Sequence, residues 1–77
     1  MQLPNKLFTY SESILSKFPL ILKTLEKEPL PVGSLYIKLQ KQIPSINEYI
    51  EILDALYSLN RVEYNDEQEV LRYVIRD

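Results

Sequence analysis

The chain has no cysteine and no histidine among its 77 residues. These absences exclude disulfide bonds, thiolate nucleophiles, imidazole bases and the usual zinc ligands. The single glycine, Gly33, excludes a glycine-rich phosphate-binding loop. No apolar run approaches the ~20 residues of a membrane-spanning helix, and the opening "MQLPNKLFTY" lacks the order of a signal peptide. We therefore expect a cytoplasmic protein that is not an enzyme and holds neither a cofactor nor a metal ion.

The residues that are present suffice for one small domain. Apolar residues make up 45% of the chain, which is too many for a disordered protein. A chain of this length buries only about 60% of its unfolded surface, so its stability is marginal and a partner could contribute to it. The net charge of −2 gives no general attraction to nucleic acid or anionic lipid. We expect an N-terminal arm over residues 1–10 and one domain over residues 11–77.

Helical spacing of apolar residues predicts two helices in the first half of the domain. The first covers residues 12–27, where Pro19 removes a backbone donor and should kink or restart the helix. Pro29 and Pro31 end it, and "LPV" at residues 30–32 follows as a short extended link. The second helix covers residues 34–42 with Gly33 at its cap. The predicted core positions of these helices are Ile14, Phe18, Ile21, Leu22, Leu25, Leu35, Tyr36 and Leu39.

The stretch "SINEYIEILDALYSLN" gives the clearest local signal, a third helix over residues 45–60. Ser45 and Glu48 match the capping-box pattern, in which each side chain accepts from the other residue's backbone N–H. Asn60 is a plausible left-handed stop. The predicted inward stripe consists of Ile46, Tyr49, Ile50, Leu53, Leu56 and Tyr57.

The last segment, "RVEYNDEQEVLRYVIRD", predicts a β-hairpin. Val62 and Tyr64 alternate with polar residues, "NDEQE" is rich in turn formers, and residues 70–75 are β-branched or aromatic except for Arg72. Three helices followed by a hairpin, with a short extended piece after the first helix, is the order of a winged helix-turn-helix. We predict this α+β fold.

The charges argue against DNA as the ligand of this fold. A winged helix reads bases with its third helix and gains affinity from Lys and Arg at phosphates. Here residues 44–60 carry Glu48, Glu51 and Asp54 and no cation, and the hairpin turn adds three more carboxylates. The lysines are scattered over the first two helices. Direct nucleic-acid binding is therefore not expected.

Apolar residues outside the predicted core stripes indicate a protein-binding surface. Helical geometry of about 100° per residue places Leu20, Ile37, Ile52 and Leu59 away from those stripes. Tyrosine supplies contact area with one polar group, as binding hot spots require. The arm adds apolar residues without a regular period, which either fold back over the domain or dock on a partner. The candidate interface residues are Leu3, Leu7, Phe8, Tyr10, Leu20, Tyr36, Ile37, Ile52, Leu59 and Tyr64.

The arm and first helix carry a distinctive pattern, "PNK…Y.ESIL..FP". It comprises Pro4, Asn5, Lys6, Tyr10, Glu12, Ser13, Ile14, Leu15, Phe18 and Pro19. With "PLPVGSLYIKL" and the hairpin, it resembles the small winged-helix middle components of ABC-three-component systems. These bacterial conflict systems, directed against phage, pair an SMC/Rad50-type ABC ATPase with an effector and a middle component. The resemblance implies no catalytic residues. It implies an adaptor that binds the ATPase and could also contact the effector.

The sequence is also compatible with two other functions. One is a DNA-binding transcriptional regulator, a dimer that pools lysines such as Lys38 and Lys41 from the first two helices. The other is an inhibitor whose acidic third helix mimics nucleic acid. The sequence also leaves a homodimeric adaptor open.

Overall fold

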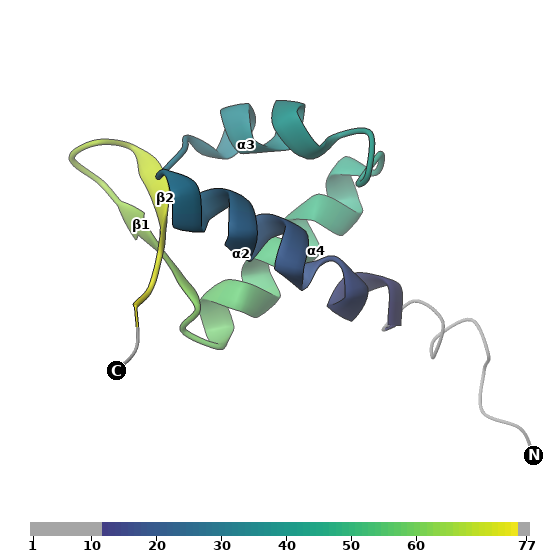
Figure 1. Ribbon diagram of the computed structural model, residues 1–77. Helices are drawn as coiled ribbons and strands as arrows, with labels where there is room; N and C mark the ends of the chain where they lie inside the picture. Colours follow the sequence, from purple (N-terminus) through teal and green to yellow (C-terminus); the bar gives the residue numbers. More distant parts are fainter. Residues whose placement is uncertain (1–11, 76–77) are drawn as a thin grey trace, which may run out of the picture.

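The computed structural model describes residues 12–75 and shows an α+β arrangement consistent with a winged helix-turn-helix (Figure 1). Residues 12–16 are helical and lead into α2 (Phe18–Lys27), α3 (Val32–Leu39) and α4 (Ile46–Ser58). The antiparallel strands β1 (Val62–Asn65) and β2 (Val70–Tyr73) follow as a hairpin. This order of elements confirms the predicted fold class. The predicted arm, residues 1–10, lies outside the described residues.

The first predicted helix restarts at Pro19, as expected. Residues 12–16 end in a turn in which Lys17 N–H donates to the Ile14 carbonyl at 3.1 Å. Pro19 then lies in the first turn of α2, where its missing N–H leaves no helical hydrogen bond unmade. The break sets residues 12–16 apart from α2 at one end of the domain, opposite the hairpin in Figure 1.

The link between α2 and α3 joins the helices to the hairpin. Leu30 forms an isolated antiparallel bridge with Leu71, with N···O distances of 3.1 and 2.7 Å. The predicted start of the next helix at Ser34 is wrong, because Pro31 already occupies the N-cap and its carbonyl accepts from Leu35 N–H at 3.0 Å. Gly33 therefore lies inside α3. The helix also ends at Leu39 and not at Gln42.

Both ends of α4 follow the local chemistry of the sequence. Ser45 Oγ accepts from Glu48 N–H at 3.2 Å, which confirms one half of the predicted capping box. At the other end Asn60 is left-handed, with φ of 61°, as predicted. Asn60 N–H donates to the Tyr57 carbonyl and Arg61 N–H to the Leu56 carbonyl, so two of the free carbonyls of the last turn are satisfied.

The other half of the capping box is replaced by a tertiary contact. The Glu48 carboxylate accepts from Lys17 Nζ at 2.6 Å and from Ser13 Oγ at 3.2 Å. Both partners precede α2, so the carboxylate fastens the start of α4 to the first turns of the domain. The Lys17 hydrogen bond holds the pKa of Glu48 below its ordinary value, although partial burial acts in the opposite direction.

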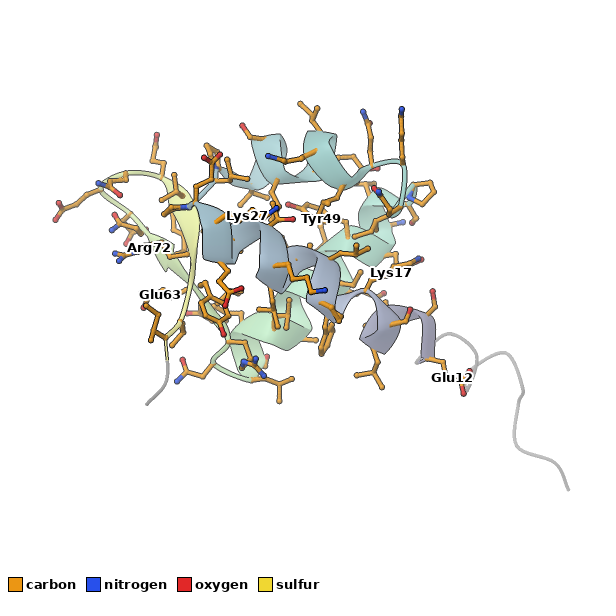
Figure 2. All side chains as sticks on the ribbon, in the orientation of Figure 1. Glu12, Lys17, Lys27, Tyr49, Glu63 and Arg72 are labelled. Atoms are coloured by element: carbon orange, nitrogen blue, oxygen red, sulfur yellow. The ribbon has the colours of Figure 1, made fainter. Side chains whose placement is uncertain are left out.

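The predicted inward stripe of α4 is partly wrong. Ile46, Ile50 and Tyr57 are exposed, whereas Ile52, which was expected off the core, is fully buried. Tyr49 fixes this rotation, because its hydroxyl donates to the Val32 carbonyl at 2.6 Å and its ring packs on Tyr36 with centroids 4.8 Å apart. Figure 2 shows Tyr49 pointing toward α3. Burial raises the pKa of Tyr49 to about 12.

One contiguous core lies beneath the three helices and the inner face of the hairpin. The strands pair Val62 with Tyr73, and Tyr64 with Leu71. On the other face, Glu63 lies opposite Arg72 (Figure 2). The Asn65 side chain accepts from Gln68 N–H at 2.9 Å and so stabilises the turn. The buried core residues are Ile21, Leu25, Leu35, Leu39, Ile43, Tyr49, Ile52, Leu56, Val62 and Leu71.

The rotation of α4 is tested by a pair of isoleucines two positions apart. Ile52→Ala removes a fully buried side chain and should lower the free energy of unfolding by about 2–5 kcal/mol. Ile50→Ala removes a half-exposed one and should cost less than about 1 kcal/mol. Urea unfolding followed by circular dichroism measures both. A larger loss for Ile50→Ala than for Ile52→Ala would mean that α4 faces the core as the sequence alone suggested.

The Lys17–Glu48 pair should make stability depend on pH. Because the folded-state pKa of Glu48 is lowered, its contribution is present above the ordinary value of 4.5 and is lost as pH falls through the lowered value. At pH 7, Glu48→Gln should lower the free energy of unfolding by about 1 kcal/mol, with a smaller difference at pH 3. Urea unfolding across this range, with Glu67→Gln in the hairpin turn as the control, measures the effect. Equal losses at both pH values would contradict it.

Candidate functional site

The structure separates the predicted interface residues into four groups, the last of which is the buried Ile52. Ile37, Leu59 and Tyr64 are exposed, as a docking role requires. Leu20 and Tyr36 are half-buried against the core, and the Tyr36 hydroxyl donates to the Pro44 carbonyl at 2.8 Å. The remaining predictions on the arm, at Leu3, Leu7, Phe8 and Tyr10, lie outside the described residues.

Ile52 is the predicted interface residue that the structure excludes from the surface. Its side chain has no exposed area, because α4 turns Ile52 inward between Tyr49 and Leu56. Two apolar stripes overlap on α4, and the sequence prediction placed the wrong one of them toward the core. The three residues expected in the core in its place, Ile46, Ile50 and Tyr57, provide exposed apolar area that the sequence prediction missed.

An open groove with mainly apolar walls lies between the N-terminal helical turns and the C-terminal half of α4. Its volume is about 570 Å³. One wall is formed by Ile14, Leu15 and Phe18, and the other by Glu51, Ala55, Ser58 and Leu59. Leu15 and Leu59 are 60% and 56% exposed, so their side chains are available to a partner. The sequence predicted Leu59 as an interface residue. It did not predict Leu15 on the opposite wall.

A second apolar surface lies on the other flank of α4. Ile46, Ile50 and Tyr57 are 49%, 48% and 64% exposed, and their spacing places them along one line of the helix. We call these three residues the α4 stripe. Next to the α4 stripe on the helix lie Asn47, Glu51 and Asp54. We call these three residues the acidic row, after its two carboxylates. Both the α4 stripe and the acidic row lie on the third helix of the domain, the helix with which a winged helix reads bases.

The charges on this face are unsuited to a DNA phosphate backbone. α4 contains Glu48, Glu51 and Asp54 and no Lys or Arg. Lys17 approaches the helix, but its ammonium group is paired with Glu48. The hairpin turn contributes Asp66, Glu67 and Glu69. A phosphate backbone facing α4 would meet carboxylates where a reader of DNA needs cations.

Residues 12–75 contain neither a metal-binding cluster nor a membrane-spanning helix. This part of the chain contains no group of three carboxylate, imidazole or thiol side chains placed to hold a metal ion. None of its helices combines the length and apolar character needed to cross a membrane.

Comparison with known proteins identifies the family of the chain. No curated protein and no solved structure matches the chain. The family model described as ABC-three component (ABC-3C) system Middle Component 7 matches residues 3–71, which leaves only the first two and last six residues outside the match. The match agrees with the family resemblance seen in the sequence pattern of the arm and first helix. The chain belongs to the Middle Component 7 family of ABC-three-component systems.

Proposed function

We propose that the chain is a non-enzymatic adaptor that binds the SMC/Rad50-like ABC ATPase of its system in the cytoplasm. The observation that carries this proposal is the exposed apolar groove between residues 14–18 and α4. A groove of this kind, with two half-exposed leucines on its walls, is typical of a protein-binding site. The system would act in antiviral defence, and the adaptor could also contact an effector subunit.

The location of the groove connects it with the predicted arm. Its first wall begins at Ile14, four positions after Tyr10 in the sequence. A partner seated between Leu15 and Leu59 would therefore lie close to the point where the arm joins the domain. We propose that the groove and the arm residues Leu3, Leu7, Phe8 and Tyr10 form one binding surface for the ATPase.

The chemistry of the groove supports binding over catalysis. Glu51 is the single ionisable side chain among the lining residues, and Ser58 is the single hydroxyl. A hydroxyl nucleophile needs an adjacent base, and the chain has no histidine to supply one. The acidic α4 supports a protein partner over DNA, which makes the regulator alternative the weaker one.

The proposal predicts which substitutions release the ATPase. Leu15→Glu and Leu59→Glu place charge on opposite walls of the groove and should each weaken binding by about 2 kcal/mol, roughly 30-fold. Removal of residues 1–10 should weaken binding in the same way. Co-purification with the ABC ATPase of the same system, followed by titration calorimetry, measures these losses.

Matched controls separate release from unfolding and from a general effect of charge. Ile75→Glu alters an exposed isoleucine beyond β2 and should leave the affinity unchanged. Circular dichroism should show a native unfolding transition for every variant. Ile37→Glu and Tyr64→Glu then report whether α3 and the hairpin belong to the same interface.

The outcomes of these binding experiments distinguish an error in the proposed adaptor function from an error in the position of the binding surface. If the wild-type chain binds the ATPase and all groove and arm variants bind equally well, the assignment of the surface is wrong. If the wild-type chain does not bind the ATPase, the adaptor function is wrong. A duplex shifted at low salt by the wild type, but not by Lys38→Glu or Lys41→Glu, would instead support the DNA-binding regulator.

A further inference from the structure

We infer that the α4 stripe is a second docking surface, distinct from the groove, and that it binds a basic amphipathic helix of a protein partner. The inference rests on the proposed function only in that the partner is a protein. It does not depend on which component of the system supplies the helix, nor on where the ATPase binds.

The geometry of the α4 stripe matches one face of a helix. Ile46, Ile50 and Tyr57 follow each other at intervals of four and seven residues, with half-buried Leu53 filling the gap. At a rise of 1.5 Å per residue, the stripe is about 16 Å long, or three turns. Helical ligands present apolar anchors with the same periodicity, so a partner helix of three or four turns would cover the whole stripe.

The stripe and the groove occupy different sides of α4. At about 100° per residue, the mean direction of the stripe is roughly 180° from that of Ala55 and Leu59, which line the groove. The acidic row lies between them on the exposed side, and the core occupies the opposite side. A partner on the stripe therefore leaves the groove accessible.

The charge of the partner follows from the acidic row. A helix on the α4 stripe would have one polar edge beside Asp54, with Glu51 farther round α4 toward the groove, and α4 has no cation to attract an acidic partner. Lys or Arg on that edge would complement these carboxylates, whereas Asp or Glu would be repelled. Complementary charges also suppress wrong partners, so the row selects a basic helix among amphipathic ones.

Other occupants match this surface less well. A second copy of the chain would use the same patch in a two-fold dimer and would present the same carboxylates without a cation from α4. Nucleic acid would bring phosphates against the acidic row and has no apolar face for Ile46 and Ile50. A second copy of the chain and nucleic acid are therefore weaker candidates for this surface than a basic helix.

The experiment uses the full chain and two designed peptides. Both peptides are helical 14-residue sequences with leucines at the same positions, one with lysine and the other with glutamate at all polar positions. Binding is followed by fluorescence anisotropy and by amide chemical-shift mapping at moderate salt. The lysine peptide should bind with shifts centred on residues 46, 50, 54 and 57, and the glutamate peptide should not bind.

Three variants and two matched controls test whether the α4 stripe and the acidic row are responsible. Ile50→Ser and Tyr57→Ser should weaken binding of the lysine peptide roughly tenfold. The matched control Ile37→Ser removes an equally large exposed side chain from α3 and should have no effect. Asp54→Lys should reduce binding of the lysine peptide and permit binding of the glutamate peptide. Glu67→Lys makes the same charge change in the hairpin turn and should do neither.

Three results would overturn the inference. The first is equal binding of the two peptides, which would show that charge does not select the partner. The second is chemical shifts centred on Leu15 and Leu59, which would place the peptide in the groove. The third is a homodimer, seen by sedimentation and dissociated by Ile50→Ser, which would make a second copy the occupant. Since ATPase binding is measured with groove variants, failure here leaves the proposed function intact.

Discussion

The rotation of α4 about its own axis is the constraint on which both candidate surfaces depend. The Tyr49 hydroxyl donates to the Val32 carbonyl, and the Glu48 carboxylate accepts from Lys17. These two contacts come from adjacent residues and reach opposite neighbours, α3 on one side and the segment before α2 on the other. With both made, Ile52 and Leu56 complete the core, and Ile46, Ile50 and Tyr57 are left on the surface. A rotation of α4 by one residue position would bury the α4 stripe and displace the α4 wall of the groove.

Local chemistry was sufficient to predict most of the fold from the sequence. Pro19 fixed the restart of the first helix, Ser45 and Asn60 fixed the ends of α4, and the polar turn fixed the hairpin. Each of these signals acts over a few residues, so it does not depend on tertiary packing. The start of α3 was misplaced because Pro31 and Gly33 are both plausible at a helix start. The proline ring presets the dihedral angle that the N-terminal end of the helix needs, so Pro31 is the cap.

The candidate site was less predictable, because it depends on a rotation that no local signal determines. α4 has apolar residues over more than half of its circumference, so two stripes at helical spacing overlap. The choice between them is made by Tyr49 and Glu48 through partners that lie 17 and 31 residues away along the chain. Leu59 and Ile37 were predicted correctly as exposed. Leu59 is the C-cap just beyond the last residue of α4, and Ile37 lies on the side of α3 opposite Leu35 and Leu39. Leu15 was missed because its wall of the groove exists only once residues 12–16 separate from α2.

The third helix of a winged helix offers a docking surface whether or not its ligand is DNA. The helix is exposed along one side and anchored along the other, which is the arrangement that the fold offers for docking in a groove of DNA. Here the exposed side has carboxylates at its centre and apolar side chains on both flanks. Each flank suits a protein, and the acidic row between them keeps nucleic acid away from either. The proposed adaptor needs a surface for each partner that it binds, and α4 alone would supply two of them in a chain of 77 residues.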